Sequence, residues 1–140
     1  MRLLAPLFGI WASAVSAQSV ISQSQGDTAL VAALQQPGLI VNRVVTWPVD
    51  WDRRAPMDVL EQTSYANASG GNATFLEFRI ATPTPLGPIL GDAFILPGNG
   101  IKEVQTHPQG AFLIQYQYRD GDSRCCPSGN VTTILDRGIP

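Results

Sequence analysis

The sequence predicts a small α+β domain that is mainly β, in which one short N-terminal helix packs on a small antiparallel sheet; a small β-sandwich or barrel is the alternative. Three observations carry this prediction. The 140 residues include 13 Gly and 11 Pro, a composition typical of turns and strands. Several short apolar or alternating runs lie between turn signals. One of them, residues 111–119, alternates so regularly that it predicts a strand by itself.

Residues 1–17 have the layout of a secretory signal peptide. A positive charge at Arg2 precedes an apolar run over 3–11, and small residues lead to Ala17. We expect cleavage after Ala17, or alternatively after Ala14, and a secreted or periplasmic location. Spanning a bilayer takes about 20 apolar residues. The apolar run over 3–11 is much shorter than this, so we do not expect it to be a membrane anchor, and we expect no transmembrane span after cleavage.

We expect residues 18–26 to form a flexible lead-in and residues 27–140 to form a single β-rich domain. The formal net charge of the chain is −2, and charged residues make up 14% of it. Lys and Arg form no cluster. This pattern argues against a nucleic-acid partner, which would require a basic surface.

The one helix that we expect covers residues 28–36. Asp27 precedes it as the N-cap residue, and Pro37 stops it. Its apolar face consists of three residues: Leu30, Val31 and Leu34. So short a helix is marginal alone and has to pack on another element.

The first strand is expected over residues 39–45, and Pro48 should end it or place it at a sheet edge. Residues 57–66 fit either a helix or a strand. The Gly-Gly turn between them and the alternating run 73–81 favours a hairpin of two strands. In the second strand of the hairpin, one face carries Leu76, Phe78 and Ile80, and the other carries Phe75, Glu77 and Arg79.

Four further segments complete the predicted sheet. Residues 89–96 are apolar around a turn or bulge at Gly91, and residues 101–106 form a short strand whose alternation is out of phase. Residues 111–119 place Phe112, Ile114, Tyr116 and Tyr118 on one face and Leu113, Gln115, Gln117 and Arg119 on the other. A last strand follows at 131–135.

Four aromatic residues are candidates for ligand binding: Trp47, Trp51, Tyr116 and Tyr118. The two tryptophans lie beside acids and arginines in a predicted loop, where they can form a platform for a sugar or a peptide. The alternative is that the indole rings cap one end of the core and the charges surround them.

Cys125 and Cys126 are the only cysteines. An even pair in an exported chain predicts a disulfide, although neighbouring Cα atoms lie only about 3.8 Å apart and ordinary disulfides prefer roughly 4.4–6.8 Å. Three alternatives stay open: an oxidised vicinal pair, two free thiols, or bonds to another chain. We expect no metal here, because a metal site takes three or four ligands.

No catalytic residues and no cofactor are predicted. His107 is the only histidine, and its position in a predicted turn favours a solvated side chain over a catalytic base. The acidic pairs Asp50/Asp52 and Asp120/Asp122 also lie in turns, where acids are common for local hydrogen bonding.

The stretch from Ile114 to Leu135 resembles the LppP/LprE-like family of bacterial exported lipoproteins and their soluble relatives, whose biochemical role is not established. The likeness lies in residues 114–119, then Gly-Asp, then Cys-Cys-Pro-Ser at 125–128, then residues 131–135. The chain lacks the lipid-carrying cysteine of the lipoprotein members. The resemblance implies a cell-envelope or extracellular setting and supplies no catalytic residues.

Together these observations predict a secreted or periplasmic, non-catalytic domain that binds or supports an unknown protein or a small ligand in the cell envelope. A thiol/disulfide redox protein or a small hydrolase is the alternative, and a homodimer linked through the cysteines is a further state that we consider.

Overall fold

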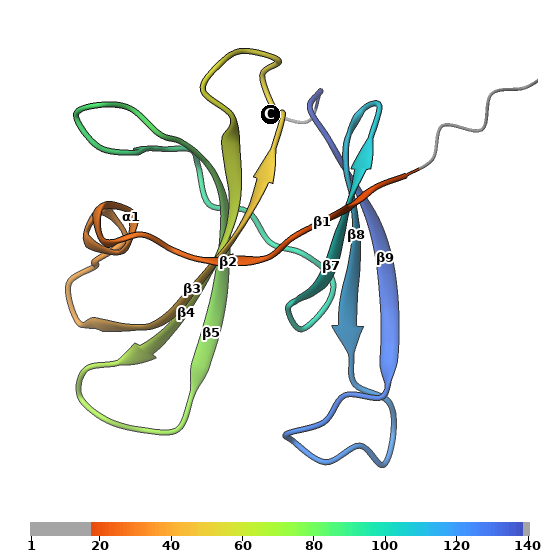
Figure 1. The fold of residues 1–140 in the computed structure, drawn as a ribbon. Helices are drawn as coiled ribbons and strands as arrows, with labels where there is room; N and C mark the ends of the chain where they lie inside the picture. Colours follow the sequence, from red (N-terminus) through yellow and green to blue (C-terminus); the bar gives the residue numbers. More distant parts are fainter. Residues whose placement is uncertain (1–17, 139–140) are drawn as a thin grey trace, which may run out of the picture.

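The structure is a computed structural model that describes residues 18–138; the predicted signal peptide lies outside the described residues. Two antiparallel sheets face each other (Figure 1). The first contains β1 (Val20–Ile21), β7 (Ile101–His107), β8 (Gly110–Gln117) and β9 (Gly129–Asp136), in that order. The second contains β2 (Ser24–Gln25), β3 (Leu39–Val49), β4 (Asp58–Asn67), β5 (Thr74–Thr82) and β6 (Ile89–Leu90), also in that order. The prediction of a mainly β domain with one short helix is confirmed. The two facing sheets form a small β-sandwich, which was the predicted alternative to a single sheet.

The core lies between the inner faces of the two sheets. Both sheets contribute buried side chains to it: Val45, Trp47, Val49, Leu60, Phe78, Leu96, Ile101, Val104, Ala111 and Leu113. In each of the six long strands, successive side chains point alternately to this core and to an outer face, as the period of two requires. Burial of these apolar side chains is the main contribution that holds the sheets together.

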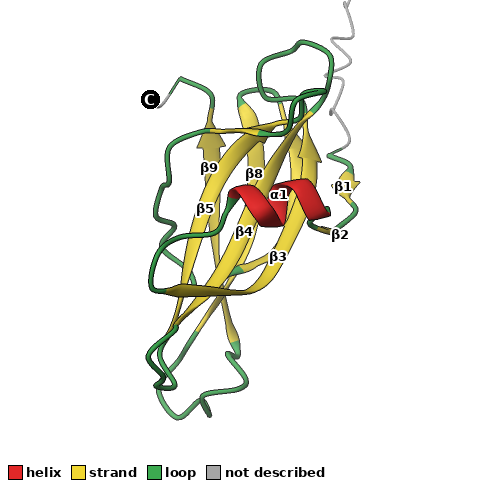
Figure 2. Cartoon of the chain, turned by 90° about the vertical axis from the view of Figure 1, so that its left-hand side faces the viewer, coloured by secondary structure: helices red, strands yellow, loops and turns green. Residues whose placement is uncertain are grey.

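Helix α1 (Thr28–Ala33) packs on the outer face of the five-stranded sheet (Figure 2). Asp27 is its N-cap, as predicted, because its carboxylate accepts a 2.7 Å hydrogen bond from the Leu30 amide. Leu30 and Leu34 are buried against Val44 and Ala81 of the sheet. This docking supplies the stabilisation that so short a helix lacks on its own.

The segment that precedes the helix belongs to both sheets. We expected a flexible lead-in over residues 18–26, but β1 pairs with β7 and β2 pairs with β3. Figure 1 shows this segment crossing from one sheet to the other. Each pairing is only two residues long. The sequence did not predict these strands, because residues 18–26 are mostly polar and show no alternation of apolar and polar residues.

Two irregularities explain where the strand patterns depart from expectation. β3 continues through Pro48 to Val49, and β2 pairs with it only at Val45 and Thr46. Pro48 therefore lies where β3 is locally an edge strand, which tolerates a residue without an N–H group. In β7 a bulge between Ile101 and Glu103 brings Ile101 and Val104 to the same buried side, which accounts for the out-of-phase alternation.

Within the described residues, no helix has the length and apolar character needed to cross a membrane.

Candidate binding site

An apolar groove lies along one side of the sandwich and has a volume of about 420 Å³. One wall consists of residues 91–97, which follow β6, and the other consists of residues 133–136 of β9. Three of the residues that line the groove also pack against the core: Ile80, Phe94 and Leu135. The groove is thus an extension of the apolar core to the surface.

The first wall exists because the chain leaves the sheet after only two residues of β6. The Gly91 amide donates a 2.8 Å hydrogen bond to the Ile80 carbonyl, and the Phe94 amide donates one of 2.9 Å to the Phe78 carbonyl. A Cβ atom at Gly91 would lie 2.7 Å from the Ile80 oxygen, so this approach requires glycine. The apolar run 89–96, in which the sequence predicts a turn or bulge at Gly91, therefore forms only the two-residue strand β6 and one isolated bridge between Phe78 and Phe94.

The second wall is an edge strand. β9 has β8 as its one neighbour in the sheet and pairs with it over all eight residues without a register shift. Four consecutive residues of β9, 133–136, line the groove. Because consecutive residues of a strand point to opposite faces, a cavity that touches all four must follow the free edge of the strand.

A buried amide joins the two walls. Gln115 of β8 is 0% exposed, and its Nε2 donates a 2.8 Å hydrogen bond to Oγ1 of Thr133. Its Oε1 accepts a 3.0 Å hydrogen bond from the Gly98 amide, just beyond the first wall. Nothing in the sequence singles out Gln115. The alternation in residues 111–119 predicts that Gln115 and Leu113 share a face, but it does not indicate which face of the strand is buried.

The charged residues that line the groove are both acidic. They are Asp92, which is exposed, and Asp136, whose Oδ1 also accepts a 2.8 Å hydrogen bond from the Gly138 amide. The neighbouring Arg137 is directed elsewhere, since its guanidinium donates to the carbonyls of Pro108 at 2.8 Å and Asp50 at 2.9 Å. Apolar side chains at the groove are accessible: Ile95 is 95% exposed and Ile134 is 45% exposed.

The four aromatic candidates do not share one surface. Trp51 lines the groove, but Trp47 is 1% exposed and belongs to the core, so it is not available to a ligand. Tyr116 lies 6.0 Å below the ammonium group of Lys102, and Tyr118 lies in the loop after β8. Trp51 is thus the one aromatic candidate that contributes to the groove.

Trp51 is held in place by close packing at the end of the sandwich. Its amide donates a 3.0 Å hydrogen bond to the Val49 carbonyl. A Cβ atom at Gly110, the first residue of β8, would lie 3.1 Å from the indole ring. The indole ring therefore lies close to Gly110 of the four-stranded sheet and forms part of the groove lining.

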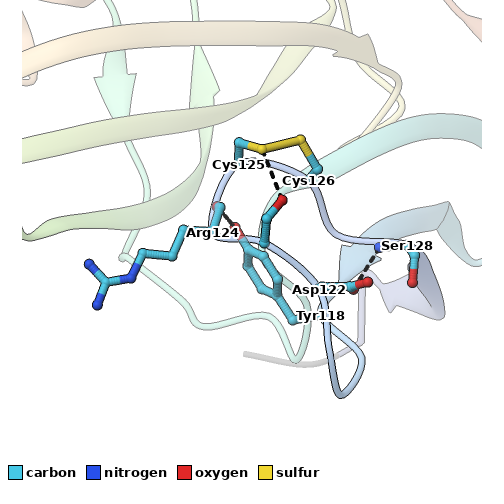
Figure 3. The surroundings of a disulfide bond; sticks show 7 residues. Tyr118, Asp122, Arg124, Cys125, Cys126 and Ser128 are labelled. Carbon is cyan, nitrogen blue, oxygen red and sulfur yellow. Dashed lines mark hydrogen bonds between the residues drawn. A yellow bond between two sulfur atoms is a disulfide. The ribbon is translucent and has the colours of Figure 1, made fainter.

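Cys125 and Cys126 lie in the exposed loop between β8 and β9 (Figure 3). Their Sγ atoms are 2.24 Å apart, at disulfide distance, and their Cα atoms are 3.8 Å apart. The loop has its own hydrogen bonds. The Asp122 carboxylate accepts from the amides of Arg119 at 2.7 Å and Ser128 at 2.8 Å, which lowers the pKa of Asp122.

Tyr118 adds a further contact to this loop, because its hydroxyl donates a hydrogen bond to the Arg124 carbonyl. The Cys126 amide donates to the Ser123 carbonyl at 3.0 Å. The shape of the loop therefore rests on side-chain and backbone hydrogen bonds in addition to the cysteine pair.

A polar cluster lies beneath helix α1, on the outer face of the five-stranded sheet. Glu61 of β4 is 0% exposed, and desolvation raises its pKa from 4.5 to about 7 against the opposing effects of a hydrogen bond from Thr63 and the charge of Arg79. The Arg79 guanidinium pairs with Glu77 at 2.7 Å. Arg79 also donates to the Gly91 carbonyl at 3.0 Å, so this cluster supports the start of the groove wall.

Two residues connect the cluster to the helix. The Tyr65 hydroxyl donates a 2.8 Å hydrogen bond to the Leu34 carbonyl at the helix C-terminus. Gln36 donates to the Tyr65 hydroxyl at 3.1 Å and to Glu77 at 3.2 Å. Burial raises the pKa of Tyr65.

Two of the residues considered for catalysis, His107 and Asp52, accept local hydrogen bonds, and so does the buried Asp58 nearby. His107 lies at the turn between β7 and β8, and its Nδ1 accepts a 3.1 Å hydrogen bond from the Gln109 amide. Asp52 accepts from the Arg54 amide at 2.9 Å. Asp58, which is 1% exposed, accepts a 3.2 Å hydrogen bond from the Asp52 amide and one from Thr82. Among residues 18–138, no three His, Cys, Asp or Glu side chains lie close enough together to hold a metal ion.

The fold and the groove together define a small two-sheet β domain with an apolar groove along one open side. The chain matches no family model, no curated protein and no solved structure.

Proposed function

We propose that this protein is an exported, non-catalytic binding domain that takes an apolar group of an envelope partner into the groove between residues 91–97 and β9. The groove is the single observation that carries the proposal. Its volume of about 420 Å³ lies within the usual range of ligand sites, about 300–1,000 Å³. The signal-peptide pattern and the resemblance of residues 114–135 to exported lipoproteins support the cellular setting.

Exposure of the rim adds to this argument. Isolated exposed apolar residues are normal on protein surfaces, but contiguous ones that open onto the core mark interaction sites. Ile95 and Ile134 both line the groove and are 95% and 45% exposed. An apolar occupant would remove both side chains from water together with the floor of the groove.

Titration with the neutral apolar dye N-phenyl-1-naphthylamine tests the proposal. We expect its fluorescence to rise on binding to the wild-type protein and to rise much less with Ile95→Asp, which places a charge in the groove. The matched control is Leu86→Asp. Leu86 is 102% exposed and does not line the groove. Equal dye binding by both variants would show that the groove is not the site.

A second candidate function rests on the exposed cysteine pair. In a thiol–disulfide exchange, a thiolate of an external dithiol attacks one sulfur and releases the other as a thiolate. The second thiol of the reductant then displaces the first sulfur, so that the external dithiol is oxidised and the pair gains two hydrogens. Intact mass before and after a mild dithiol checks this: a pair that stays oxidised excludes a redox role.

A further inference from the structure

We infer that the partner is an extended polypeptide segment that adds to the free edge of β9 as a further strand, with an apolar side chain in the groove and a basic side chain beside Asp92. This inference rests on the proposed function, because it assigns the chemical class of the occupant of the same groove.

β9 differs from the other sheet edges. The other terminal strands, β1, β2 and β6, pair over two residues each, so parts of β7, β3 and β5 also lack an outer neighbour. Among the described strands of seven residues or more, β9 is the one that lacks an outer neighbour along its whole length. β9 has eight residues, Gly-Asn-Val-Thr-Thr-Ile-Leu-Asp, with a regular register against β8. Proteins normally protect long edges with Lys, Pro, bulges or covering elements. β9 contains no Lys, no Pro and no bulge, so its unpaired backbone groups are available to another strand.

The groove lies on this same edge. Residues 133–136 line it, and at about 3.3 Å per residue these four residues span about 13 Å, enough for several backbone pairings. In strand addition the backbone hydrogen bonds supply affinity, and pockets for alternate side chains supply specificity. A strand beside β9 would direct every second side chain toward the apolar floor formed by Phe94 and Leu135.

Charge defines the rest of the partner. Asp92 and Asp136 are the charged groups of the groove lining, and Asp92 is exposed at its rim. A segment that carries Lys or Arg next to its apolar residues would gain a favourable pair there, whereas an acidic residue at the same place would be repelled.

The probe is the capped peptide KTVTIQVK, compared with ETVTIQVE of the same apolar pattern, with affinity measured by isothermal titration calorimetry on the full mature chain. Two further versions of KTVTIQVK carry backbone N-methyl groups at one or the other set of alternate residues. In an added strand only one set of N–H groups faces β9. We expect one methylated set to weaken binding about tenfold or more and the other set to leave it unchanged.

Two measurements complete the design. Hydrogen exchange should slow at amides of β9 when KTVTIQVK binds. Asp92→Asn should remove the preference for KTVTIQVK over ETVTIQVE, whereas the control Asp120→Asn, an exposed acid outside the groove, should keep it.

The same affinity for both methylated sets would overturn the inference, as would a peptide that binds without protecting β9. Sedimentation that shows the free protein pairing with a second copy through β9 would overturn it too. If the dye binds in the groove but the peptide does not, strand addition fails while the proposed function stands. If the dye does not bind either, both fail.

Discussion

Oε1 of Glu61 lies 3.8 Å from Nε of Arg79 beneath helix α1, and within residues 18–138 neither atom has a hydrogen-bond partner. The pair is too long for a hydrogen bond, so attraction between the charges offsets only part of the cost of burying the Glu61 carboxylate. The proton affinity of Glu61 is therefore higher in the folded protein than in the unfolded chain.

The free energy of unfolding should thus depend on pH through Glu61. Its pKa rises from 4.5 to about 7 on folding, so between these values the folded state binds more protons than the unfolded state. Stability then falls as the pH rises from 4.5 to 7 and levels off above 7, with a contribution of roughly 3 kcal/mol. Glu61→Gln should remove this decrease and raise stability at pH 8. Urea unfolding at pH 5 and pH 8 measures both effects.

The matched control for this experiment is Glu103→Gln on the other sheet. Glu103 is partly exposed, so the variant should keep the wild-type pH dependence. If Glu61→Gln keeps it as well, Glu61 is not the titrating group.

Tyr65→Phe should loosen helix α1. The variant loses the hydrogen bond from the Tyr65 hydroxyl to the Leu34 carbonyl and the acceptor for Gln36, and it retains the buried ring. We expect a loss of about 1 kcal/mol in the free energy of unfolding and faster hydrogen exchange at residues 28–34. Tyr116→Phe, on the outer face of the other sheet, is the control and should change neither quantity.

Gly91→Ala should disrupt the groove. The added Cβ atom would lie 2.7 Å from the Ile80 carbonyl oxygen, so residues 91–94 have to move away from β5. We expect a lower thermal unfolding midpoint and weaker dye binding. In the control Gly138→Ala, the nearest atom to the new Cβ is the end of the Asp136 side chain at 3.3 Å, and an unchanged midpoint is expected. Wild-type dye binding by Gly91→Ala would contradict this role.

The cysteine pair should contribute little to global stability. A disulfide stabilises chiefly by closing a loop in the unfolded chain, and here the sequence separation is 1. Replacing both cysteines by Ser should therefore shift the thermal midpoint less than Asp122→Ala does, because Asp122 holds two amides of the loop. Differential scanning calorimetry of the two variants decides the order; the reverse order would mean that the pair holds the loop.

Sequence patterns were sufficient for elements whose period or cap is local. The N-cap at Asp27, the hairpin of β4 and β5, and the assignment of Phe78 and Arg79 to opposite faces all follow from neighbouring residues. The buried position of Glu61 was missed, although residues 57–66 carry a signal for it: Glu61 is in phase with Val59, Thr63 and Tyr65 in a period of two.

The groove could not be predicted, because it depends on packing between segments about 40 residues apart. Nothing near Phe94 indicates that it lies across from Leu135. The orientation of β8 was equally undetermined. Both faces of β8 carry apolar residues. The face with Ala111 and Leu113 is buried, whereas Tyr116, on the more aromatic face, is 38% exposed. Trp47 was misplaced as a binding candidate for the same reason, since a tryptophan near a strand end fits either face.

The crossing of residues 20–25 from one sheet to the other has a mechanical consequence. β1 and β2 are edges on one side of the sandwich, and β9 and β6 are the edges on the other. The chain thus joins the sheets directly along the side opposite the groove, with only residues 22–23 between the two short strands. Small rotations of one sheet relative to the other should pivot about that linkage and change the width of the groove. Binding in the groove would then affect the stability of the pairing between β1 and β7, on the opposite side of the sandwich.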